Sequence, residues 1–158
     1  MRPRTKRGSR GFSLLELVIV VVIIAIIAAI AVPRLSRGTA GAADSALAGD
    51  LAVLRNALDL YSAEHTGAYP TEANVVAALT TYTDAIGGTA AAKDATHIYG
   101  PYVRQIPALP VGAKKNSTGI ASVDAAGVGW IYTPATGALK ANCLDTEKDD
   151  SGKQYNQY

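Results

Sequence analysis

Cysteine and histidine are nearly absent from this sequence of 158 residues, which holds one cysteine, Cys143, and two histidines, His65 and His97. A single cysteine makes an intramolecular disulfide impossible. Neither histidine has a partner at a zinc-motif spacing such as H-x-x-x-H, so we expect both on the surface or at a helix end. Stability must therefore come from an apolar core or from neighbouring molecules.

Residue patterns typical of enzymes are also missing. Ser13 lies at the start of a long apolar run, Cys143 has no histidine near it in sequence, and no glycine-rich phosphate loop occurs. We therefore expect no catalytic activity and no firmly bound cofactor.

Acidic residues are absent before Glu16, whereas five bases crowd the first ten residues: Arg2, Arg4, Lys6, Arg7 and Arg10. Of the 15 bases, 10 remain after residue 11 against 13 acids, which leaves a charge of 10 − 13 = −3. These bases are dispersed, and the one adjacent pair, Lys114-Lys115, is typical of a solvated turn. Nucleic-acid binding is not expected.

A long apolar run follows the basic segment. Residues 12–32 would form about 31 Å of helix, the thickness of a bilayer core. A secretory signal peptide has a shorter run and a small-x-small cleavage site, for which only Ala29-Ile30-Ala31 is a candidate. A single-pass anchor fits better, with the basic flank in the cytoplasm and residues 34–158 on the other side.

Glu16 has no use in a plain anchor, because a carboxylate at the centre of a membrane helix costs about 2.5–3.5 kcal/mol and somewhat less near the interface. Such an acid points to a function and to a cationic partner. Cleavage between Gly11 and Phe12 would supply one, since the new α-amino group of Phe12 lies four residues from Glu16.

The segment from Gly11 to Pro33 resembles the N-terminus of type IV prepilins: Gly, Phe, a few small or apolar residues, Glu, about 16 apolar residues and Pro. The resemblance implies that a prepilin peptidase of the inner membrane cuts after Gly11 and methylates the amine of Phe12. It also implies that the mature helix packs into a filament, with Glu16 directing subunit assembly. Pro33 is expected to end or kink the helix.

Helix signals resume beyond Pro33. Five apolar residues recur at spacings of four and three and so share one helix face, and Gly67 is a plausible stop: Leu47, Leu51, Leu54, Leu58 and Tyr61. We expect an α+β, pilin-like fold in which a long bent helix packs on a small antiparallel sheet. The expected parts are a cleaved leader (1–11), a transmembrane and assembly helix (12–33), its amphipathic continuation (34–66) and a β-containing globular region (67–158).

The globular region contains one clear hairpin signal. Strand-like runs at 128–133 and 138–142 flank the turn Pro134-Ala135-Thr136-Gly137. Trp130 and Tyr132 share a face and are expected to cover the helix stripe. A short helix is predicted at 75–79, and the Gly/Ala-rich stretch 83–96 is predicted to be a loop.

The segment from Tyr99 to Pro107 resembles the G-P-Y-x-x-x-x-P segment of major pseudopilins of type II secretion. Adhesive type IV pilins usually close their C-terminal region with a disulfide, which this chain cannot form. Residues 108–112, Ala-Leu-Pro-Val-Gly, depart from the D-P-W-G-x-P-Y pattern of major pseudopilins. A minor or atypical type IV pilin, serving adhesion, motility or DNA uptake, therefore stays open as the alternative.

The pseudopilin resemblance implies several partners: the prepilin peptidase and methyltransferase, other pseudopilins, an assembly platform with its ATPase, and the inner membrane. It also suggests one ion. Four carboxylates crowd the C-terminal region, where major pseudopilins have a calcium-binding loop: Asp145, Glu147, Asp149 and Asp150. Oxygen donors at such spacing suit Ca²⁺, although no D-x-D-x-D-G pattern is present, and a solvated acidic tail is the alternative reading.

Overall fold

A computed structural model describes residues 12–158 of the chain, with the side chains of 12–31 and 38–158. The elements are helix α1 (Leu14–Glu64), helix α2 (Val75–Thr80), strands β1 (Tyr82–Thr83), β2 (Thr89–Ala90), β3 (Gly119–Ala121), β4 (Val128–Thr133) and β5 (Ala138–Ala141), and a final 3-10 turn η1 (Tyr155–Gln157). The α+β class predicted from the sequence is confirmed.

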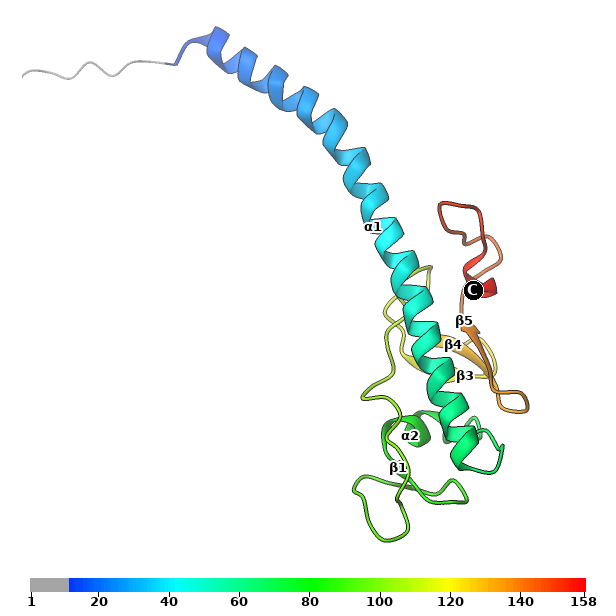
Figure 1. Cartoon of the computed structure of the whole chain (residues 1–158). Coiled ribbons are helices and arrows are strands. Elements are labelled where there is room, and N and C mark those ends of the chain that lie inside the picture. Colours follow the sequence, from blue (N-terminus) through cyan, green and yellow to red (C-terminus); the bar gives the residue numbers. More distant parts are fainter. Residues whose placement is uncertain (1–11) are drawn as a thin grey trace, which may run out of the picture. The chain divides into compact units, whose positions relative to one another are not determined.

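The chain divides into two compact units after Thr39. The first unit contains the apolar beginning of α1, and the second contains the rest of α1 and all of the strands (Figure 1). Pro33 lies within the bounds of α1, so the helix continues through this residue, as expected of one long helix. The kink predicted at Pro33 stays a prediction.

The core of the second unit forms on the apolar face of α1. All five residues of the predicted stripe are buried, and Trp130 and Tyr132 from β4 are fully buried in the same cluster. The indole nitrogen of Trp130 donates to the Pro107 carbonyl at 2.9 Å, and the Tyr132 hydroxyl donates to the Pro70 carbonyl at 2.9 Å. Both large rings therefore enter the core with their polar atoms satisfied.

The main sheet differs from the predicted antiparallel one. Strands β4 and β5 form the expected antiparallel hairpin, but β3 pairs with β4 in parallel, which makes the sheet mixed. The stretch 83–96, predicted to be a loop, contains β2, which pairs antiparallel with β1. That pairing involves two residues per strand, too few for an alternating pattern to be recognised in the sequence.

Candidate functional site

The beginning of α1 is capped by its own side chains. The Ser13 hydroxyl oxygen accepts a hydrogen bond from the Leu15 backbone N–H at 3.3 Å, and a Glu16 carboxylate oxygen accepts one from the Ser13 backbone N–H at 2.9 Å. This reciprocal arrangement is a capping box, in which two N–H groups that the helix leaves unpaired find acceptors. Glu16 therefore has a structural partner within its own chain.

This capping role of Glu16 is absent from the sequence predictions above, although the signal was available. Ser13-Leu14-Leu15-Glu16 is an S-x-x-E pattern placed directly before an apolar helix. Phe12, one residue ahead of the cap, lies outside the helix and is 80% exposed. Gly11, on the other side of the expected cleavage point, lies outside the described residues.

The apolar segment that follows is exposed along its whole described length. Residues Leu14–Ala31 have a mean hydropathy of 3.3, and no residue of this segment is buried. At 1.5 Å per residue these 18 residues span about 27 Å, close to the hydrocarbon thickness of a bilayer. Lipid or other apolar helices must therefore cover this surface.

The carboxylates of the acidic tail are engaged separately rather than together. Asp145 accepts from the Asn156 amide at 2.6 Å, Glu147 accepts from the backbone N–H of Leu144 at 2.7 Å, and Asp149 accepts from the backbone N–H of Ser151 at 2.8 Å. Hydrogen bonds from the hydroxyls of Tyr158 and Ser151 are the largest causes that hold the pKa of Asp149 well below its usual range.

Asp150, the fourth residue of the proposed calcium cluster, is exposed. Within residues 12–158, no three His, Cys, Asp or Glu side chains gather as a metal site. The calcium hypothesis therefore gains no support from this geometry and stays a prediction.

The Gly100-Pro101-Tyr102 segment lies against the C-terminal end of α1. The Tyr102 hydroxyl donates to a Glu64 carboxylate oxygen at 2.6 Å, and the Tyr102 ring meets the Tyr61 ring edge-on at 5.7 Å. Burial, and then the hydrogen bond to Glu64, raise the pKa of Tyr102. This contact fixes the segment to the helix, which is a structural role for the tyrosine.

The histidines differ in their surroundings. His97 lies near the surface beside Asp94, and His65 follows directly after α1, so both agree with the prediction of a surface or helix-end position. The His65 ring is nevertheless buried against Tyr61, and the residue is only 3% exposed.

In a comparison with known protein families, residues 6–32 fit the family model described as the prokaryotic N-terminal methylation motif. Searches of curated proteins and of solved structures give no match to this chain. The motif and the exposed apolar helix together support a type IV prepilin-like protein with a single-pass membrane anchor. The motif indicates a structural subunit rather than an enzyme, and it implies processing by a prepilin peptidase and assembly into pilus-like filaments.

Proposed function

We propose that this chain is a subunit of a type II secretion pseudopilus, a periplasmic filament whose growth drives protein export. The observation that carries the proposal is an exposed apolar helix with one carboxylate, Glu16, in its first turn. Such a helix is stable in lipid and equally stable in a bundle of like helices, so it can pass from one to the other.

Processing prepares this transfer. In the proposal, the precursor spans the inner membrane once, with its basic leader in the cytoplasm and residues 34–158 in the periplasm. Cleavage after Gly11 frees the amine of Phe12, which is then methylated. Within one straight helix the amine and Glu16 are poorly placed to meet, so the partner of Glu16 is the Phe12 amine of a neighbouring subunit, and this pair sets the stagger between subunits.

A second surface of α1 supports packing between subunits. Opposite the buried stripe, seven exposed residues recur at spacings of four and three without a single charge: Ala42, Ala46, Gly49, Val53, Asn56, Leu60 and Ala63. Val53 and Leu60 are 52% and 51% exposed. A 4-3 repeat of small and apolar residues is the pattern of a helix–helix seam. We call these seven residues the outer stripe.

The choice of a pseudopilus over a surface pilus follows from composition and motif. Cys143 cannot form an intramolecular disulfide, which surface pilins usually have, and residues 99–107 resemble the pseudopilin segment. The departure at residues 108–112 favours the second candidate, a minor or atypical type IV pilin. In both cases the subunit catalyses nothing, and an assembly ATPase with its membrane platform supplies the work.

Deletion of the gene in its native host tests the proposal. If the chain belongs to a pseudopilus, exported proteins accumulate in the periplasm, whereas surface fibres, motility and DNA uptake persist. Loss of surface fibres with normal secretion would favour the second candidate. Normal secretion together with normal surface fibres would reject both.

A further inference from the structure

A cavity of about 440 Å³ lies at the C-terminal end of α1, in the second unit, and none of the described residues that line it belongs to the outer stripe. The end of α1, the turn that follows it and the loop between β1 and β2 enclose the cavity. Its volume falls in the range of small-molecule sites.

The inner wall of the cavity is a rigid pair of rings. Tyr61 and His65 stack with centroids 3.8 Å apart and planes within 4°. Two backbone carbonyls lie 2.8 Å from the His65 ring nitrogens: that of Tyr61 at Nδ1 and that of Asp84 at Nε2. Carbonyls only accept, so a neutral imidazole, which has one N–H, donates to one of the two and the other is a close contact. These contacts place the ring between α1 and the loop that joins β1 and β2.

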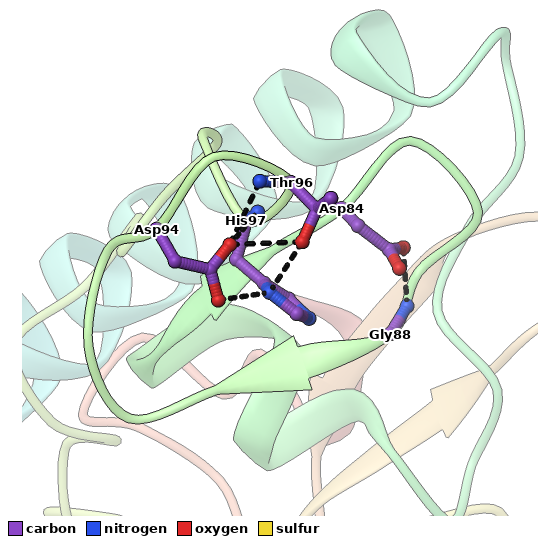
Figure 2. A network of polar contacts seen from close by, with 5 residues as sticks. All are labelled: Asp84, Gly88, Asp94, Thr96 and His97. Atoms are coloured by element: carbon purple, nitrogen blue, oxygen red, sulfur yellow. Dashed lines mark hydrogen bonds and ion pairs between the residues drawn. The ribbon is translucent and has the colours of Figure 1, made fainter.

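Hydrogen bonds also hold the loop between β1 and β2, which borders the cavity. The Asp84 carboxylate accepts from the backbone N–H of Ile86 at 3.0 Å. It also accepts from the backbone N–H of Gly88 at 2.7 Å (Figure 2). The Asn74 side-chain amide donates to the Gly87 carbonyl at 2.9 Å. The loop that borders the cavity is therefore organised before any ligand arrives, which lowers the entropic cost of binding.

The Tyr61 hydroxyl is a polar group of this cavity that has no partner among the described residues. Tyr61 is 4% exposed, and its hydroxyl makes no hydrogen bond within the part of the chain that the structure describes. The hydroxyl reaches Gly87, where a side chain would come within 2.6 Å of it. Burial, and then the charge of Asp84, raise the pKa of Tyr61, so the hydroxyl keeps its proton. Among the described residues, the buried side-chain atoms without a partner are Thr83 Oγ1 and Asn156 Oδ1, so the Tyr61 oxygen is accessible from the cavity and can donate to a ligand that enters it.

The other lining groups define the chemistry of that ligand. Among the described residues, no Asp, Glu, Lys or Arg lines the cavity. The polar groups are the hydroxyls of Thr66 and Thr71 and the side chain of Asn74, and the apolar ones include the ring of Tyr69 and Pro70. The Tyr69 ring packs directly against Gly137, where a Cβ atom would lie 2.3 Å from the ring.

Uncharged donors and acceptors beside an aromatic face suit a ligand with many hydroxyls and an apolar ring face. An anionic ligand would lose its hydration without gaining a counter-charge, because no Lys or Arg is among the described lining residues. We propose that this cavity binds a neutral monosaccharide unit, with the Tyr61 hydroxyl donating to a sugar oxygen and the Tyr69 ring contacting the sugar's C–H face. The inference is independent of the filament proposal and stands if that proposal fails.

The test uses the full chain in phosphatidylcholine nanodiscs, because sugar-based detergents would occupy the site. The probes are D-glucose, D-galactose and N-acetyl-D-glucosamine, with glucose 6-phosphate as the charged comparison. Saturation-transfer NMR should detect at least one neutral sugar and show no transfer to glucose 6-phosphate. Empty nanodiscs give the background.

Two variants locate the binding. Tyr61→Phe keeps the ring stack and removes only the unpaired hydroxyl, so the dissociation constant should rise about tenfold. Ala68→Trp, at an exposed lining residue, should block binding by filling the cavity. Tyr82→Phe, outside the lining, is the matched control and should bind normally.

Three results would each overturn the proposal. The first is the absence of transfer to all three neutral sugars. The second is equal binding of a sugar by the native chain and by Ala68→Trp or Tyr61→Phe. The third is equal binding of glucose and glucose 6-phosphate, which would reject a site that selects neutral ligands.

Discussion

Glu16 has one role that the structure shows and one that is proposed, and the two must be separated. Its carboxylate completes the capping box with Ser13, and a helix cap contributes about 0.5–2 kcal/mol. The same carboxylate is the proposed partner of a neighbouring Phe12 amine. Both roles need an acceptor at residue 16, but only the second needs a negative charge.

The pair Glu16→Gln and Glu16→Leu distinguishes these roles. Glutamine can still accept the hydrogen bond from the Ser13 N–H but carries no negative charge. Leucine can neither accept that hydrogen bond nor carry the charge. We expect both variants to insert and to be cut after Gly11, and neither to form filaments when it is the only copy, because the neighbour's amine is left unpaired. Shearing of the cells and immunoblotting of the released fibres measure this outcome.

A difference between the two variants would show which role assembly requires. If Glu16→Gln forms normal fibres and Glu16→Leu does not, the cap is what assembly requires, and the charge pair is rejected. Normal fibres from both would reject both roles in assembly.

Cys143 is a poor nucleophile in the folded chain. Burial, and then the charge of the nearby Glu147, raise the pKa of its thiol to about 12. Since the thiolate is the reactive form, iodoacetamide at pH 8 should alkylate the folded protein at least about tenfold more slowly than the denatured protein. Glu147→Gln should speed the reaction. Equal rates in folded and denatured protein would contradict this account of the thiol.

The second half of α1 is an element with two apolar faces. One face is filled by the core, and the outer stripe on the other face is exposed and uncharged. A globular unit that worked alone would gain nothing from exposing Val53 and Leu60, so we interpret the outer stripe as a contact between subunits.

A charge placed in the outer stripe tests that interpretation. Leu60→Glu should leave the melting temperature nearly unchanged, because exposed substitutions alter stability by about 0.5 kcal/mol or less. It should still abolish filaments, since the carboxylate would be buried without a partner between helices. Ala48→Glu adds the same charge at an exposed residue outside the outer stripe and should assemble. Normal fibres from Leu60→Glu would remove the outer stripe from the interface.

The elements that could be predicted from the sequence are those with a strong local pattern. The 4-3 spacing from Leu47 to Tyr61 and the hairpin around Pro134 depend on neighbours in the sequence, and the structure confirms both. The pairing of β3 with β4 and the burial of His65 depend on contacts between distant segments, which periodicity does not reveal. The cap at Glu16 was predictable from S-x-x-E, whereas the cavity at Tyr61 was not.

At the scale of the whole molecule, the calcium hypothesis predicts that calcium bound to the acidic tail stabilises the folded chain. The carboxylates of the acidic tail have separate partners, so an ion would have to rearrange the tail in order to bind. If calcium binds, the full chain in nanodiscs should melt higher in calcium than in chelator, by the equivalent of about 2.7 kcal/mol at a hundredfold excess over Kd. Asp145→Asn with Asp149→Asn should remove the difference. Equal melting temperatures in calcium and chelator would identify a solvated tail.

The predicted cleavage after Gly11 can be tested with substitutions in the leader. A peptidase that needs a small residue beside the scissile bond should reject a β-branched side chain there, so Gly11→Val should leave the full-length precursor in the inner membrane. Gly8→Val is the control: it adds the same valine side chain to the leader, but away from the cleaved bond, and should be processed normally. Normal processing of Gly11→Val would contradict the predicted cleavage site.

The mature N-terminus is the most direct test of the prepilin account, which rests on the motif match at residues 6–32 and on the apolar helix beyond it. The measurement is N-terminal sequencing and mass spectrometry of the chain isolated from its native membrane. The account predicts a mature chain that starts at Phe12 and carries one added methyl group on its amine. A chain that still starts at Met1, or one cut after Ala31 as a secretory signal peptide would be, would contradict it.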